Sequence, residues 1–177
     1  MKKTVLFIVS CAAVLVSLIL GIVLAVPSMN ARQKAVARYV AAVNSGKAAK
    51  LNAVSNVSNF SAFFGDGTSF TDSKEGDPRL SLLRQSGIDC PPALLESSGD
   101  EDVETSDKSK ATLLKVKIIG FEPTDGQDGG LMQLSGSVTA LIRVEYRDVN
   151  GKKQTYDSAN VFTVTKSGSK WGVLSVS

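Results

Sequence analysis

Few residues of this 177-residue chain could carry out chemistry. Histidine is absent, which removes His-based triads, His-ligated zinc and the commonest general base near neutral pH. Cys11 lies in an apolar segment and Cys90 in a polar one, so we expect them on different sides of a membrane boundary and not in one disulfide. Cys90 can pair between chains, but a buried or idle thiol is the stronger prediction.

Acidic residues are concentrated in residues 96–110, which hold six acids and one aliphatic side chain. This composition predicts a solvent-exposed loop. Its spacing does not match an EF-hand, because no glycine follows the third carboxylate and no glutamate stands at the twelfth position. Asp66 and Asp72 could reach the mouth of a pocket, but no spacing forces them together. The sequence therefore predicts no metal site, no cofactor and no catalytic residue.

Aromatic side chains are the remaining candidates for a site. Three of the seven phenylalanines lie within five residues, just before the turn signal at residues 65–67. A pocket for a ligand or partner would be lined by Tyr39, Phe60, Phe63, Phe64, Tyr156 and Trp171. The alternative is a closed core filled by such side chains, and we favour it because an aromatic residue on an apolar stripe usually packs inside.

Two helices are predicted before the aromatic cluster. Asn30 is a suitable N-cap for a helix over residues 31–45, Gly46 ends it, and a second helix follows over 47–55. An apolar stripe with the spacing i, i+3, i+4 and i+7 is formed by Val36, Tyr39, Val40 and Val43. A basic face opposite this stripe carries Arg32, Lys34 and Arg38; it could touch lipid headgroups, although ordinary solvation is the preferred interpretation.

A short helix over residues 79–85 and four strands complete the predicted elements. Pro91 and Pro92 prevent continuation of that helix. The strands cover residues 111–122, a stretch that alternates from 138 to 147, then 153–166 and 170–176, with Leu114, Val116 and Ile118 on one face of the first. Helices followed by strands predict an α+β fold, with a curved antiparallel sheet packed against the first helix.

The register of the central hairpin can be predicted from the sequence. A two-residue turn at Asn150-Gly151 would pair Val144 with Asp157, mixing apolar and polar side chains. A bulge at Gly151 shifts the register by one residue and pairs Val144 with Tyr156. The same shift pairs Val138 with Phe162 and Arg143 with Asp157. Apolar matching favours the bulged register, because a one-residue slip exchanges the faces of the strand.

An uncharged stretch near the N-terminus predicts a membrane anchor. Residues 4–26 form a run of 23 residues, about 34 Å of helix, which is enough to cross a hydrocarbon core of about 30 Å. We expect residues 1–3 in the cytoplasm, 4–26 in the membrane and 27–177 as one extracytoplasmic domain, because Lys2 and Lys3 adjoin the membrane. The alternative is a secreted protein released by cleavage after Ala25.

The net charge argues against nucleic acid as a partner. Lys2 and Lys3 are two of the 20 basic residues, so 18 remain against 17 acids beyond residue 26, a net charge of about +1. A domain that binds nucleic acid usually carries a strong basic excess. We therefore expect no nucleic acid partner. The expected partners are the membrane, through residues 4–26, and proteins, including further copies of this chain.

The chain resembles the nuclear-transport-factor-2-like superfamily. The resemblance is carried by residues 39–51 (YVAAVNSGKAAKL), by the hairpin of residues 144–153 (VEYRDVNGKK) and by the closing Lys170-Trp171-Gly172-Val173. It implies a cone formed by a helix and a curved sheet, which is either filled or holds a small ligand. Members with this layout include accessory proteins of bacterial envelope and secretion machines.

We predict a non-catalytic binding or scaffold domain held at a membrane by residues 4–26, and the resemblance implies an accessory part of an envelope or secretion assembly. One alternative is a secreted protein that binds a small apolar ligand. Another is an enzyme similar to isomerases and dehydratases of the superfamily, which need an acid or base inside the cone. The acids of this chain lie mainly in predicted loops or at solvent-facing strand positions, which disfavours the enzyme.

Overall fold

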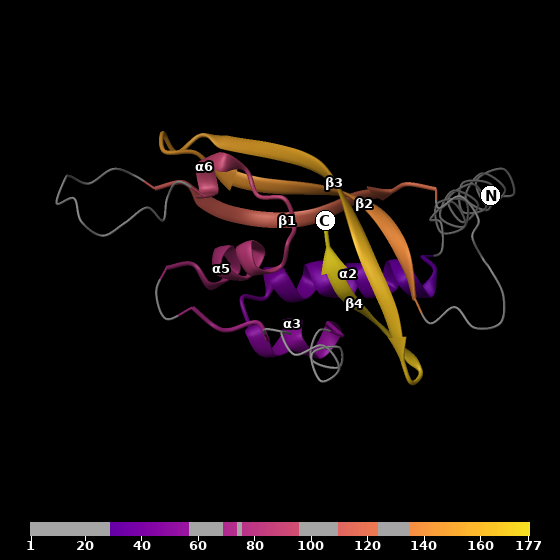
Figure 1. Ribbon diagram of the computed structural model, residues 1–177. Coiled ribbons are helices and arrows are strands. Elements are labelled where there is room, and N and C mark those ends of the chain that lie inside the picture. The colour runs from indigo at the N-terminus through magenta and orange to yellow at the C-terminus, as the bar shows by residue number, and fades with distance from the viewer. Residues whose placement is uncertain (1–28, 57–68, 74–75, 96–109, 124–134) are drawn as a thin grey trace, which may run out of the picture. The chain divides into compact units, whose positions relative to one another are not determined.

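A computed structural model describes residues 29–56, 69–73, 76–95, 110–123 and 135–177. Within them, the chain from Ala31 to Ser177 forms one compact unit (Figure 1). The predicted anchor over 4–26, the phenylalanines at 60, 63 and 64, and nearly all of the predicted acidic loop lie outside the described residues. None of the described helices is both long and apolar enough to cross a membrane.

The core of the unit is a four-stranded antiparallel sheet. Its strands are β1 (Thr112–Phe121), β2 (Ser135–Arg147), β3 (Lys153–Ser167) and β4 (Lys170–Val176), paired in the order β1-β2-β3-β4. The sheet is curved, and β3 bends along its length toward the turn that leads to β4 (Figure 1). The predicted α+β class and the antiparallel meander are confirmed.

The β2–β3 hairpin has the bulged register. Val144 pairs with Tyr156, Val138 with Phe162 and Arg143 with Asp157, as the apolar matching predicts. Five residues connect Arg147 to Lys153, and Gly151 adopts a φ of 76°, which favours glycine. These pairs confirm the predicted register. Its physical reason is that it places the apolar side chains of both strands on one face.

β1 differs from the simple alternation expected for it. Register shifts occur between Leu113 and Lys115 and between Ile118 and Gly120, so that Leu114 and Ile119 are extra residues. As a result Leu113 and Val116 are both buried, Leu114 is only half-buried and Ile119 is exposed. The expectation that Leu114 shares the inner face with Val116 is wrong, because the first bulge exchanges the faces of the strand.

The helices agree with their predicted positions, with one addition. α2 covers Ala31–Asn44 and α3 covers Ala48–Val54, separated by Gly46 at a φ of 65°. α5 covers Pro78–Gln85, and α6 covers Pro92–Leu95, where no helix was expected. α5 already ends at Gln85, before the two prolines. Pro92 is instead the first residue of α6, because proline fits the first turn of a helix.

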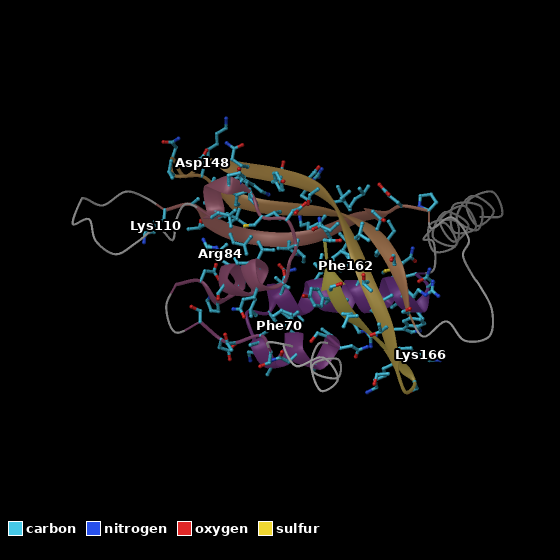
Figure 2. The ribbon with its side chains drawn as sticks, viewed as in Figure 1. Phe70, Arg84, Lys110, Asp148, Phe162 and Lys166 are labelled. Atoms are coloured by element: carbon cyan, nitrogen blue, oxygen red, sulfur yellow. The ribbon has the colours of Figure 1, made fainter. Side chains whose placement is uncertain are left out.

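α2 packs its apolar stripe on the sheet. Val36, Tyr39, Val40 and Val43 are all buried, as predicted, and face a layer that includes Val138, Ala140, Ile142, Val144 and Phe162. The ring of Tyr39 contacts that of Phe162 edge-on, with centroids 6.1 Å apart. Figure 2 shows Phe162 in this interior layer. The first helix therefore covers one face of the sheet, as the sequence predicts.

Side chains occupy the outer edge of β1. The Asn44 amide donates to the Val116 carbonyl at 2.7 Å and accepts from the Val116 N–H at 2.9 Å. The Arg79 guanidinium donates to the carbonyls of Leu113 and Leu114 at 3.1 and 3.2 Å. These bonds satisfy backbone groups that would otherwise be available to another strand.

Candidate functional site

The candidate site lies where α2 meets the start of β4. Trp171 is the second residue of β4 and is half-buried. Its carbonyl accepts a hydrogen bond from the Arg38 guanidinium of α2 at 3.0 Å, and the Arg32 guanidinium lies 5.1 Å from the centre of its ring. These contacts join residues of a helix and a strand that lie more than 130 positions apart in the sequence.

Two hollows flank the Trp171 side chain. The first has a volume of about 480 Å³ and is lined by Ala31, Lys34, Ala37, Arg38, Ser169, Lys170 and Trp171. The second, of about 260 Å³, is lined by residues 52–56 of α3 and its end, together with Arg38, Ser167, Lys170, Trp171 and Gly172. Arg38, Lys170 and Trp171 line both, so the hollows form one continuous surface.

The second hollow is held together by Asn56. Its side-chain amide donates to the carbonyl and hydroxyl oxygens of Thr165, both at 2.8 Å, and its backbone N–H donates to the Val173 carbonyl. A Cβ added to Gly172 would lie 2.7 Å from the Asn56 side chain. Glycine at 172 therefore permits the end of α3 to approach β4 and to form the wall of this hollow.

The surface around Trp171 is basic. We define the Trp171 surface as Lys34, Arg38, Lys170 and Trp171. None of the residues that line the two hollows is acidic. In the described part of the chain, no carboxylate lies within salt-bridge distance of Lys34, Arg38 or Lys170. The surface offers cations to an anion and an aromatic ring to an apolar or interfacial group.

The described acids elsewhere are mostly paired or hydrogen-bonded. Glu145 contacts Lys117 and Lys153, and the hydrogen bonds of these lysines lower the pKa of its carboxyl. The Arg143 guanidinium, bonded to Asp157, likewise lowers the pKa of that carboxyl. Figure 2 shows Asp148 and Lys166 near opposite ends of β3, so Asp148 lies far from the basic Trp171 surface.

Asp72, one of the two acids considered at a pocket mouth, has a structural role. Its carboxylate accepts a hydrogen bond from the Ala48 N–H at 2.7 Å and so caps the first turn of α3. Asp66 lies outside the described residues. Within the described part of the chain, no three metal-ligating side chains converge on a point that could hold an ion.

Cys90 is a half-buried free thiol. Burial raises the pKa of this thiol, although the charge of Arg84 acts in the opposite direction. A raised pKa keeps the thiol protonated at neutral pH, and the protonated form is a poor nucleophile. This environment agrees with the idle thiol that the sequence predicts.

The predicted aromatic candidates have different surroundings. Tyr39 is 2% exposed, and its hydroxyl donates to the Ser86 carbonyl at 2.9 Å. Tyr156 is half-buried opposite Val144 and packs against the core. Trp171 lines both hollows. Phe60, Phe63 and Phe64 lie outside the described residues.

The sequence missed the cations that complete the Trp171 surface. The sequence favours an ordinary solvated face for Lys34 and Arg38 and gives no local signal for Lys170. The spacing of four residues between Lys34 and Arg38 places them one turn apart on α2, and this was the available signal. No local pattern relates that turn to Lys170, because the two segments meet only through tertiary packing.

Comparison with known proteins adds little. No family model matches the chain, and no curated protein matches it. One solved structure is similar: a Xanthomonas campestris protein described as a calcium/calmodulin dependent protein kinase II association domain. The two are 18% identical with a TM-score of 0.42, and the match covers 86% of this chain and 89% of that one. A likeness of this size carries no argument about function.

Proposed function

We propose that this chain is a non-catalytic binding or scaffold domain, held outside the cytoplasm by the anchor at residues 4–26. In this proposal it is a membrane-anchored member of the nuclear-transport-factor-2-like superfamily and an accessory part of an envelope or secretion assembly. The observation that carries the proposal is the Trp171 surface, where three cations that have no carboxylate partner in the described part of the chain lie with a half-buried tryptophan on α2 and β4.

The packing of the interior supports binding at a surface. Tyr39, which is almost fully buried, contacts the rings of Phe70 and Phe162 and donates its hydroxyl hydrogen to the Ser86 carbonyl. A side chain with these contacts fills space and leaves its polar atom satisfied. The superfamily assignment is supported by the glycine break between α2 and α3 and by the antiparallel meander that follows.

Membrane retention and topology test the proposal together. The full chain with a C-terminal tag is expected to stay with membranes through a high-salt wash and through alkaline carbonate, because residues 4–26 are long enough to span. Protease added outside intact cells that lack an outer barrier is expected to digest the tag. Recovery of the chain in the wash or the medium, or a tag protected until the cells are lysed, would contradict the proposal.

Crosslinking in intact membranes tests the scaffold role. A short amine-reactive crosslinker is expected to join the chain to a second extracytoplasmic chain, of the same or another protein, through lysines of the described domain. The matched control is the same reaction on membranes dissolved in denaturant, where specific adducts disappear. Adducts that form equally in both samples, or a chain that stays monomeric in both, would argue against a scaffold.

A further inference from the structure

We propose that the Trp171 surface binds the anionic phospholipid headgroups of the membrane that holds the anchor; this inference rests on the proposed function. Lys34, Arg38 and Lys170 supply the positive charge, and none of the residues lining the two hollows is acidic. Juxtamembrane clusters of lysine and arginine are attracted to anionic lipid surfaces over about a Debye length.

The geometry of the surface is partly fixed. The Arg38 guanidinium donates to the Trp171 carbonyl at 3.0 Å and to the Lys34 carbonyl at 3.3 Å, so it is held between α2 and β4. Lys34 and Lys170 are exposed and line the larger hollow from opposite elements, one from α2 and one from β4. A phosphate in this hollow would therefore meet cations from both sides.

The short connection between the predicted anchor and α2 favours a lipid over a soluble anion as the bound group. Only residues 27–30 separate the predicted anchor from Ala31, the first residue of α2, and Ala31 itself lines the larger hollow. Four extended residues span at most about 14 Å. In this proposal the anchor ends at the headgroup layer, so the short connection keeps Ala31, one of the residues lining the hollow, within about 14 Å of that layer.

The tryptophan provides a second reason to prefer lipid. Tryptophan is enriched at membrane–water interfaces, where its ring lies in the headgroup region with its polar edge hydrated. Trp171 is half-buried and lines both hollows, so it borders the space proposed for the headgroup. An acidic polypeptide could bind the same cations, but the short connection to the proposed anchor brings only the lipid headgroups close to them.

The single tryptophan of the chain makes the test direct, because all tryptophan fluorescence comes from Trp171. The full chain is reconstituted into vesicles of phosphatidylcholine, with or without about one third phosphatidylglycerol, each containing the same small fraction of a lipid spin-labelled on its headgroup. Quenching of Trp171 is expected to be at least twofold greater in the vesicles with phosphatidylglycerol. This difference is expected to disappear in 1 M salt, where the Debye length is about 3 Å.

Charge reversal separates this surface from the overall charge of the domain. The double variant Lys34→Glu and Lys170→Glu is expected to lose the extra quenching. The matched control is Lys110→Glu and Lys115→Glu, which changes the net charge by the same amount at exposed positions. Figure 2 shows Lys110 far along the sheet from Lys166, which neighbours Trp171 in the β3–β4 pairing. The control is expected to behave like the unchanged chain.

Three outcomes would overturn the inference: equal quenching in both kinds of vesicle, equal loss in both double variants, or suppression of the difference by millimolar inorganic phosphate at constant ionic strength. The last would identify a site for a soluble anion. Extraction of the chain from the vesicles by alkaline carbonate would instead contradict the proposed function. A chain that resists extraction but shows no lipid-dependent quenching contradicts the lipid site alone.

Discussion

Tyr39 illustrates how a residue that resembles a ligand contact can serve the core. Its ring lies edge-on to both Phe70 and Phe162, and its hydroxyl donates to the Ser86 carbonyl in a buried position. Burial raises the pKa of the Tyr39 hydroxyl well above its ordinary value near 10. The phenol is therefore a neutral hydrogen-bond donor in the folded protein, with no capacity to act as a base at physiological pH.

This raised pKa predicts a pH-dependent effect of Tyr39→Phe. Near pH 8 the variant should be about 0.5–1.5 kcal/mol less stable than the unchanged chain, because the Ser86 carbonyl loses its donor. Above about pH 10 the unfolded chain ionises this tyrosine while the folded chain does not, so the unchanged protein loses stability as pH rises. The difference between the two proteins should shrink between pH 8 and pH 11.

Urea denaturation at both pH values measures this change. Tyr156→Phe is the matched control, because the Tyr156 side chain is half-buried and its hydroxyl has no hydrogen bond within the described part of the chain. An unfolding free energy that depends on pH identically in the unchanged chain and in Tyr39→Phe would contradict the prediction.

The β2–β3 hairpin is the element that fixes the sheet. Asp148 accepts hydrogen bonds from the N–H groups of Asn150 and Lys152, at 2.9 and 3.0 Å, and so shapes the turn. Hydrogen bonds, led by that from Gln154, lower the pKa of the Asp148 carboxyl, so it stays ionised and accepting at neutral pH. This turn places Val144 opposite Tyr156 and hence the whole apolar face toward α2.

Gly151→Ala should destabilise the domain by about 1–2 kcal/mol, because a left-handed φ of 76° disfavours any residue with a Cβ. An added methyl group would meet nothing within 4 Å, so the effect comes from the backbone alone. Gly151→Asn should recover part of the loss, since asparagine tolerates this region. Thermal unfolding of both variants measures the effect.

Gly120→Ala in β1 is the matched control for that series. An added Cβ there lies in ordinary contact with Leu141, at 3.5 Å, and its backbone is not in the left-handed region. Its stability should change by less than about 0.5 kcal/mol. Equal losses in Gly120→Ala and Gly151→Ala would show that backbone strain at the turn is not the cause.

At the scale of the whole molecule, the domain contains its own core. The buried apolar cluster runs from Ala35 to Val173 and involves α2, α3, α5, α6 and all four strands. The compact unit begins at Ala31, immediately after the residues that connect it to the predicted anchor. The domain is therefore expected to fold without residues 1–30.

Removal of residues 1–30 should leave the domain folded, because every residue of the buried cluster remains. The shortened chain should give the far-ultraviolet circular dichroism spectrum of a folded α+β domain. It should also unfold in one cooperative transition. A shortened chain that unfolds without a cooperative transition would contradict this. The same chain should lose membrane retention if residues 4–26 are the anchor, which links the result to the proposed function.

The sequence by itself determined the features that repeat locally. Alternation with period two located the strands, the i, i+3, i+4, i+7 stripe identified the buried side of α2, and apolar matching chose the hairpin register. Each of these follows from burying one face of a regular element. A single extra residue, as in the bulges of β1, breaks the period without changing the composition, so the inner face of β1 was only partly predicted.

Only the tertiary structure decided which distant residues meet. The hydrogen bond from Arg38 to Trp171, the Asn44 side chain on the edge of β1 and the Asp72 cap on α3 each join segments that carry no shared local pattern. Backbone N–H and carbonyl groups left unpaired at helix ends and sheet edges form hydrogen bonds with the polar side chains that packing brings near them. The Trp171 surface arises in the same way, since the packing of α2 against β4 brings Lys34 and Lys170 to one hollow.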